Sequence, residues 1–122
     1  MAQRILIADD EPNIVTSLQF LMEQAGYEIK VAANGQQALD LAASFQPDLV
    51  LLDIMLPLKS GYEVCQRLKS DPATRDIKIV VLSAKGRDVE VAKALELGAD
   101  AFVVKPFSTR ELVAKVREML GA

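Results

Sequence analysis

Four places along the chain carry side chains that could act together on a phosphoryl group. They are the acidic pair Asp9-Asp10, then Asp53, Ser83 and Lys105, each at the end of a short apolar run. Carboxylate oxygens are the ligands that a hard divalent cation such as Mg²⁺ prefers, and Mn²⁺ can substitute for it. Beside such a cation, Asp53 could act as a nucleophile and form an aspartyl phosphate. Lys105 would pair with one phosphoryl oxygen, and Ser83 would donate a hydrogen bond to another.

The formal charges of these side chains favour a site that depends on a cation. Three carboxylates in one place repel one another, so at least one pKa would rise without a cation. Asp9, Asp10 and Asp53 contribute −3 and Lys105 contributes +1, so a divalent cation brings the total to zero. Each residue also has a simpler interpretation: Asp10 could cap a helix, Ser83 could cap a turn, and Asp53 and Lys105 could be turn or loop residues. Their coincidence at four strand ends favours the shared site.

Five strands are predicted to bring these residues together. Four runs are apolar throughout, as is typical of parallel strands buried on both faces: 5–8, 49–52, 79–82 and 101–104. A further run, 28–32, alternates apolar and polar residues and is typical of an edge strand. Helical periodicity fills the intervals, for example at Leu18 and Met22. The pattern predicts an α/β fold, a doubly wound parallel sheet of five strands in the order 2-1-3-4-5 with helices on both faces.

Capping residues predict where several helices begin and end. Gly26 and Gly98 stand where a helix would end before a strand, in a left-handed conformation. Asn34 is placed to cap the second helix, and Ser108 with Glu111 forms a capping box for the last one. Because the carboxyl ends of parallel strands meet at one edge of the sheet, this architecture places the reactive side chains side by side.

Composition excludes several classes of function. The 122 residues contain no histidine, which excludes Ser-His-Asp chemistry and His-ligated metals, and a single Cys65, which excludes an intrachain disulfide and is expected to pack in the core. The net charge of −3 argues against nucleic-acid binding by this domain. The short apolar run 5–8 is followed directly by acids and is neither a signal peptide nor a membrane span. We therefore expect a cytoplasmic location and no contact with a membrane.

The chain resembles a receiver domain of the response regulators of two-component phosphorelay signalling, over essentially its whole length. The segments that carry the resemblance are Ile5–Glu11, Asp48–Pro57, Val81–Ala84, Gly98–Ala101 and Lys105–Phe107. The resemblance implies a flavodoxin-like receiver fold and a single receiver domain over residues 1–122, with no effector domain in this chain. It also implies a phosphorylation-activated switch that catalyses only its own phosphoryl transfer and a slow autodephosphorylation, so that it is not an enzyme in the usual sense.

The resemblance also assigns roles at the predicted site. Asp53 would be the phospho-acceptor. Asp10, Asp53 and the backbone carbonyl of Met55 would bind Mg²⁺ directly, and Asp9 would bind it through water. Ser83, the backbone of Ala84 and Lys105 would hold the phosphoryl group.

Further roles concern the surroundings of the site. The Lys105-Pro106 peptide is expected to be cis. Phe102 matches an aromatic switch position that turns inward as Ser83 moves toward the phosphoryl group, although it could simply fill the core of a buried strand. Met55 and Lys85 match positions that tune the lifetime of the phosphoryl group.

The resemblance implies two partner surfaces. A histidine kinase or a histidine phosphotransfer protein would dock on the first helix and the loop after the fifth strand, at Asn13, Ile14, Ser17, Phe20 and Pro106, with Phe107 beside them. Phe20 could equally be a lone exposed aromatic. The output face would comprise the fourth helix, the fifth strand and the fifth helix, with Val91, Leu95, Ala101, Glu111 and Lys115, and it could form a homodimer.

The output face departs from the pattern of many dimerising regulators. Part of their charged network is present, as Glu96, Asp100, Glu111 and Lys115. Val91 and Ala101 stand where such regulators usually carry an Arg and an Asp. Either the dimer differs or another protein buries Val91, unless Val91 is a residue at the fringe of the core.

Three other classes of protein match this sequence less well. A phosphatase with an Asp nucleophile usually carries a second acid two residues later, where this chain has Met55. A dinucleotide-binding module needs a Gly-rich turn after the first strand, and residues 9–13 contain no glycine. A pseudo-receiver would work as a binding module without phosphorylation, but it usually lacks an acid or the lysine, and both are present here.

Overall fold

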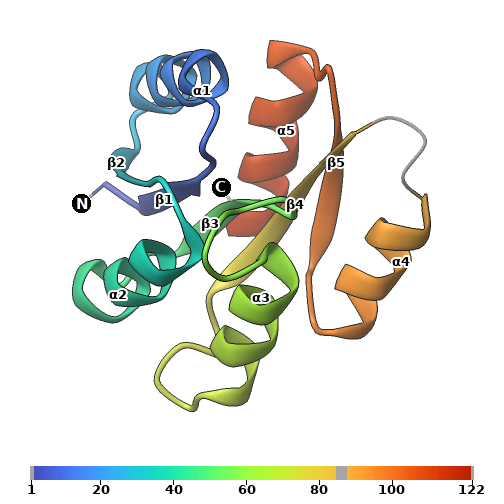
Figure 1. Ribbon diagram of the computed structural model, residues 1–122. Coiled ribbons are helices and arrows are strands. Elements are labelled where there is room, and N and C mark those ends of the chain that lie inside the picture. Colours follow the sequence, from blue (N-terminus) through green and yellow to red (C-terminus); the bar gives the residue numbers. More distant parts are fainter. Residues whose placement is uncertain (1, 85–87, 122) are drawn as a thin grey trace.

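A computed structural model describes residues 2–84 and 88–121, in which strands and helices alternate strictly (Figure 1). The strands are β1 (Arg4–Ala8), β2 (Glu28–Ala32), β3 (Leu49–Asp53), β4 (Lys78–Ala84) and β5 (Ala101–Lys105). The helices are α1 (Pro12–Gln24), α2 (Gly35–Phe45), α3 (Gly61–Ser70), α4 (Asp88–Glu96) and α5 (Thr109–Leu120). All strand pairs are parallel, in the order β2-β1-β3-β4-β5, which confirms the predicted sheet.

The core consists of two apolar layers, one on each face of the sheet. Ile5 and Ile7 of β1 pack with residues of α1 and α5, whereas Leu6 and Ala8 of the same strand pack with residues of α2 and α3. Figure 1 shows α1 and α5 on one side of the sheet and α2, α3 and α4 on the other. A strand between two helical layers buries successive side chains on opposite faces, which explains why the central runs contain no polar residue.

The two edge strands, β2 and β5, are more exposed than the interior strands, and their patterns of exposure differ. The exposure of β2 alternates along most of the strand, as predicted. In β5, Val103 is buried, but Phe102 and Val104 are 43% and 38% exposed. The prediction that 101–104 is buried on both faces is therefore wrong. The strand lies at the sheet edge, and α4 leaves an open groove of about 240 Å³ beside Phe102 and Val104.

Most of the predicted helix boundaries are confirmed. Gly26 and Gly98 have φ of 96° and 112°, in the region that favours glycine. The Asn34 side chain accepts a hydrogen bond from the backbone N–H of Gln37. The Ser108 hydroxyl oxygen accepts one from the N–H of Glu111. These contacts satisfy N–H groups that the first turn of a helix leaves without a partner.

The beginning of α1 differs from the interpretation of Asp10 as a helix cap. The residue at the cap position is Glu11, and its side chain makes no capping hydrogen bond. Instead, the backbone N–H of Glu11 donates to Asp9 Oδ1 over 2.9 Å. Asp10 is exposed and is free of the capping role that the alternative assigned to it.

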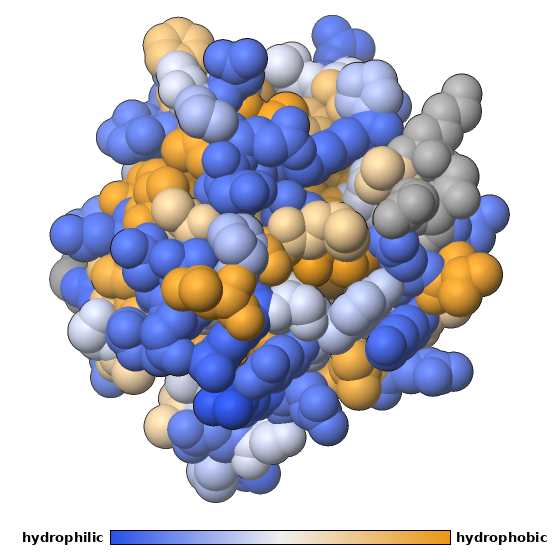
Figure 2. Space-filling view, in the orientation of Figure 1, coloured by the Kyte–Doolittle hydropathy of each residue, from blue (hydrophilic) through white to orange (hydrophobic). Residues whose placement is uncertain are grey.

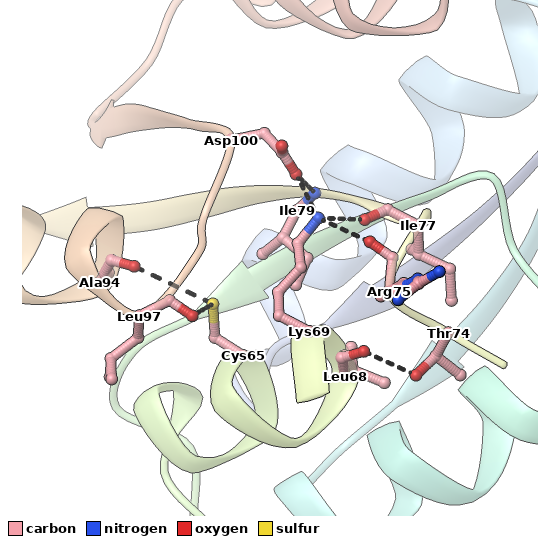
Figure 3. A network of polar contacts seen from close by, with 10 residues as sticks. All are labelled: Cys65, Leu68, Lys69, Thr74, Arg75, Ile77, Ile79, Ala94, Leu97 and Asp100. Atoms are coloured by element: carbon pink, nitrogen blue, oxygen red, sulfur yellow. Dashed lines mark hydrogen bonds and ion pairs between the residues drawn. The ribbon is translucent and has the colours of Figure 1, made fainter. Parts of the chain in front are cut away.

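A polar network joins the end of α3 to the starts of β4 and β5 (Figure 3). Lys69 Nζ donates to the carbonyl oxygens of Arg75 and Ile77 and to Asp100 Oδ2, the last over 3.0 Å. Asp100 Oδ2 also accepts from the backbone N–H of Ile79 over 2.8 Å. Asp100 was predicted to belong to a charged network on the output face, but Lys69 and the backbone of Ile79 hold it at this junction instead.

Cys65 lies in the core, as predicted. Its sulfur is 3.8 Å from the carbonyl oxygen of Leu97 and 4.0 Å from that of Ala94 (Figure 3). Burial raises the pKa of the thiol to about 11, so Cys65 stays protonated at neutral pH. Within the described residues, every helix is too short or too polar to traverse a bilayer.

Candidate functional site

Asp53 is the last residue of β3, a strand that lies between β1 and β4. Its side chain is almost fully buried, and Oδ1 accepts a hydrogen bond from the backbone N–H of Met55 over 3.1 Å. The central position places the carboxylate between the ends of the two neighbouring strands. Asp53 is therefore the residue around which the site is arranged.

Asp9 and Asp10 follow β1 and complete a cluster of three carboxylates. One oxygen from each of Asp9, Asp10 and Asp53 lies within 4.8 Å of the other two. Asp9 is 1% exposed, whereas Asp10 is open to solvent. Oxygen donors at this spacing, with one exposed member, fit a hard cation that keeps several of its waters, as Mg²⁺ does.

Lys105, at the end of β5, lies within ion-pair distance of two members of this cluster and of Glu11. Its ammonium nitrogen is 3.1 Å from Asp9 Oδ2, 3.2 Å from Glu11 Oε1 and 3.7 Å from Asp53 Oδ2. The first two are hydrogen bonds, and the third is an ion pair at longer range. The resting position of Lys105 is therefore nearer to Asp9 and Glu11 than to Asp53.

Burial and charge act differently on the pKa values of Asp53 and Lys105. Burial raises the pKa of Asp53 above 3.8, and the charges of Asp9 and Asp10 add to the rise, although the Met55 N–H and Lys105 oppose it. Burial alone would lower the pKa of Lys105, but Asp53, Asp9 and the hydrogen bond to Glu11 outweigh burial and raise it. The attraction between Asp53 and Lys105 therefore raises the pKa of Lys105 and limits the rise of the pKa of Asp53.

A small pocket of about 110 Å³ opens above Asp53. Ser83 and Ala84 of β4 line it together with Lys105, so the structure brings the predicted phosphoryl-binding residues beside the predicted acceptor. The Ser83 hydroxyl donates to the carbonyl oxygen of Ala84 over 3.3 Å. The pocket therefore places a hydroxyl and an ammonium group beside the Asp53 carboxylate, and these two groups can contact an anionic substituent on Asp53.

Two further acids line this pocket, Glu11 and Glu90, and neither was assigned to the site from the sequence. Glu11 was accessible to sequence reasoning, because it directly follows the acidic pair after β1. Glu90 lies on α4, and its approach to the pocket depends on how that helix packs against the sheet. No residue pattern within the helix indicates that approach.

Gly61, at the start of α3, allows the loop after Asp53 to close tightly. Its N–H donates to the carbonyl oxygen of Ile54, and a Cβ at this position would lie 2.5 Å from the carbonyl oxygen of Asp53 and 2.6 Å from Cα of Ile54. Both atoms belong to the backbone and cannot rotate away. Position 61 therefore requires glycine if the backbone of Asp53 is to keep its place.

Gly61→Ala is expected to lower the free energy of unfolding by about 2–3 kcal/mol, because the backbone at Asp53 must move to admit the methyl group. Urea denaturation followed by circular dichroism measures the loss. Gly26→Ala is the control, since alanine would be strained at its φ of 96° but nothing lies within 4 Å of its Cβ position. A loss for Gly61→Ala no larger than that for Gly26→Ala would contradict the argument.

The remaining residues predicted around the site are placed as follows. The Lys105-Pro106 peptide is cis, as predicted. Met55 is exposed, with its side chain directed away from the core. Phe102 is also exposed, so its alternative role as a core residue is wrong. Lys85 lies outside the described residues.

Of the residues predicted to dock a phosphodonor, Asn13, Ile14 and Ser17 lie in the first half of α1, Phe20 lies in its second half, and Pro106 follows β5. Phe20 is 59% exposed, and Asn13, Ser17 and Pro106 are exposed as well. Ile14 and Phe107 are half-buried against the apolar layer beneath α1 and α5. Figure 2 shows exposed apolar groups scattered among hydrophilic ones on the face that it presents.

The predicted output face has an apolar centre. Val91 is 9% exposed and lines the groove between α4 and β5 together with Leu95 and Phe102, so it belongs to the fringe of the core. Ala101 is half-buried, and Glu111 is exposed. Lys115 pairs with Glu118 on its own helix over 3.7 Å.

Comparison with known proteins identifies the class to which these features belong. The family model described as the response regulator receiver domain matches residues 5–117. A putative response regulator from Chloroflexus aurantiacus has 33% sequence identity and a TM-score of 0.96, with all of both chains covered.

Two further solved structures are similar along the chain. The receiver domain of the sensor histidine kinase PA1611 from Pseudomonas aeruginosa has 26% identity and a TM-score of 0.92, with all of both chains covered, and its structure contains a magnesium ion in the active-site cleft. The BeF3-activated receiver domain of DrrB has 32% identity and a TM-score of 0.88, again with all of both chains covered.

Proposed function

Since this chain belongs to the response regulator receiver family of two-component systems, we propose that it is a switch that takes a phosphoryl group onto Asp53 in a Mg²⁺-dependent reaction. The observation that carries the proposal is the arrangement around Asp53. A buried carboxylate faces a pocket, with two further carboxylates and one ammonium group within reach. Such a set of groups can hold a cation and an anionic phosphoryl group at the same time.

The residues present fit Mg²⁺ through their donor chemistry. Asp10, Asp53 and the backbone carbonyl of Met55 would hold it directly, and the buried Asp9 would hold it through water. When bound, the ion would neutralise negative charge on the phosphoryl oxygens and on the carboxylates. The raised pKa of Asp53 supports this assignment, because a carboxylate that burial and two neighbouring acids disfavour in its charged form gains from a nearby cation.

The chain's own groups account for the transfer. A carboxylate oxygen of Asp53 forms a bond to phosphorus while the bond from phosphorus to a donor imidazole nitrogen, or to the acyl oxygen of a small phosphodonor, breaks. Lys105 pairs with one phosphoryl oxygen, Ser83 donates a hydrogen bond to another, and the backbone of Ala84 lies beside them. The 122 residues contain no histidine, so the phosphohistidine would lie outside them, on a histidine kinase or a phosphotransfer protein. The proposed catalysis is limited to this transfer and to a slow autodephosphorylation.

The output follows from the exposed position of Phe102. Its ring stands at the groove between α4 and β5 and next to a second groove along α5. Rotation of Ser83 toward the phosphoryl group would free space that Phe102 can enter, which changes the surface formed by α4, β5 and α5. That surface would bind the next protein in the pathway or a second copy of the chain.

The test is incubation of the protein with acetyl phosphate, with Mg²⁺ and with a chelator, followed by mass spectrometry of the intact protein. We expect a gain of one phosphoryl group only with Mg²⁺. No gain under either condition would identify a pseudo-receiver and contradict the proposal, and release of phosphate with continuous turnover would identify a phosphatase instead.

A further inference from the structure

Glu11 makes an ion pair that none of the roles above uses. Its side chain makes no capping hydrogen bond to α1 and contacts Lys105 instead, with 3.2 Å between Oε1 and Nζ. Glu11 is not one of the three acids whose oxygens gather within 4.8 Å. It is 59% exposed, whereas Lys105 is 17% exposed, so the pair stands at the rim of the pocket.

The ammonium group of Lys105 has three N–H donors. In the structure one is directed to Asp9 and another to Glu11 at hydrogen-bond distance, while Asp53 Oδ2 is 3.7 Å away. A phosphoryl group on Asp53 would need this ammonium group nearer to Asp53. Lys105 must then lose at least one of the hydrogen bonds to Asp9 and Glu11 that hold it at the rim of the pocket.

Asp9 and Glu11 differ in what they do once a cation is present. A divalent cation near Asp9 and Asp53 takes up their negative charge and weakens their hold on Lys105. Glu11 lies outside this cluster and keeps its charge available for Lys105. It is therefore the partner that continues to compete with an incoming phosphoryl oxygen.

We propose that Glu11 is a positioning residue that holds Lys105 in its resting place and competes with the phosphoryl group for it. This inference rests on the proposed function of Asp53. Glu11 then lowers the stability of the phosphorylated state without touching the transferred group. A half-exposed ion pair has a modest effect, so removal of the Glu11 charge is expected to strengthen binding of a phosphoryl mimic roughly three-fold.

The variant that tests this is Glu11→Gln, which keeps the size of the side chain and removes its charge. Two readouts are needed. The first is the ¹H–¹⁵N NMR signal of the Lys105 ammonium group in the unphosphorylated protein, which reports its hydrogen bonds directly. The second is the affinity for beryllofluoride at Mg²⁺ concentrations shown by titration to be saturating for each variant.

Glu90→Gln is the matched control. It removes one negative charge from another wall of the same pocket, and among the described residues Lys105 has its ion pairs with Asp9, Glu11 and Asp53. If charge alone mattered, the two variants would strengthen beryllofluoride binding equally and would leave the Lys105 signal unchanged.

The expected result is that Glu11→Gln shifts or broadens the Lys105 signal and strengthens beryllofluoride binding more than Glu90→Gln does. An unchanged Lys105 signal, or equal affinities for the two variants, would overturn the inference while leaving Asp53 as the acceptor. If the unaltered protein fails to bind beryllofluoride with Mg²⁺, the proposed function fails, and this inference fails with it.

Discussion

Asp53→Asn is expected to abolish the Mg²⁺-dependent gain of mass from acetyl phosphate. The amide has no negatively charged oxygen to attack phosphorus, and it removes one of the three carboxylates that gather at the strand ends. Asn has nearly the same size and can still accept the hydrogen bond from the N–H of Met55, so the fold should persist. The loss should therefore be complete and should not reflect unfolding.

The same substitution should make the protein more stable at neutral pH. The pKa of Asp53 is raised in the folded state, chiefly by burial, so the folded protein binds this proton more tightly than the unfolded chain does. The sign follows from linkage: ionisation of Asp53 costs stability as the pH rises from about 3.8 through the raised folded pKa, and the cost is complete above it. Asn removes that cost, so the melting temperature at neutral pH should rise by a few degrees.

Thermal unfolding measured at neutral pH and again well below pH 3.8 separates this effect from others, since Asp53 is then protonated in both states and the gain should vanish. Asp40→Asn is the control, because Asp40 is an exposed acid on α2 that is hydrogen-bonded to Gln36. A melting temperature for Asp53→Asn that falls at neutral pH would contradict the argument, as would phosphorylation of this variant to the level of the unaltered protein.

The sequence predicted the order of the sheet and the meeting of Asp9, Asp53, Ser83 and Lys105 at one edge, because both follow from the position of each residue in its strand. The position of a residue at the end of its strand can be inferred from the local sequence. A parallel sheet then places the carboxyl ends of neighbouring strands side by side. The caps at Asn34 and Ser108 were predictable for the same reason, since each hydrogen bond spans three residues.

Features that depend on contacts between distant elements were not predictable in this way. The run 101–104 has the sequence of a buried strand, but the open grooves beside α4 and α5 leave Phe102 and Val104 exposed. Asp100 was predicted to be part of a surface network, but Lys69, thirty-one residues earlier, forms an ion pair with it. The role of Glu11 is of the same kind, because its partner Lys105 is ninety-four residues away.

Lys105→Met is expected to destabilise the protein and, at the same time, to strengthen its binding of Mg²⁺. Without the ammonium group, the buried Asp9 loses its hydrogen bond over 3.1 Å, and the acids at the site repel one another without compensation. Breaking a largely buried pair in this way costs about 2–3 kcal/mol of unfolding free energy. Met preserves most of the aliphatic packing, so the loss reports charge rather than volume.

The pH dependence of this loss has a defined direction. The pKa of Lys105 is raised in the folded state above 10.5, where carboxylate attraction and hydrogen bonds outweigh the opposing effect of burial. A raised lysine pKa contributes stability that is complete below the unfolded value and is lost as the pH rises through the folded value. The difference between the two proteins should therefore be constant from neutral pH to mildly alkaline pH and should shrink above 10.5.

Mg²⁺ should narrow the difference in stability between the two proteins as its concentration rises. The ammonium group lies 3.1 Å from Asp9 and 3.7 Å from Asp53, so it repels a cation that the same carboxylates attract. Its removal is expected to strengthen Mg²⁺ binding roughly ten-fold. At high Mg²⁺ the ion should then stabilise the variant by about 1.4 kcal/mol more than the unaltered protein, which recovers about half of the loss. Isothermal titration calorimetry and thermal unfolding across a Mg²⁺ series measure both effects.

Lys115→Met is the control for charge at a distance, because Lys115 pairs only with Glu118 on the exposed side of α5 among the ion pairs of the described residues. It should change neither stability nor Mg²⁺ affinity appreciably. Weaker Mg²⁺ binding by Lys105→Met would show that Lys105 organises the carboxylates for the cation instead of competing with it. In that case Lys105 would already be required for binding of the metal, and not only for contact with the phosphoryl group.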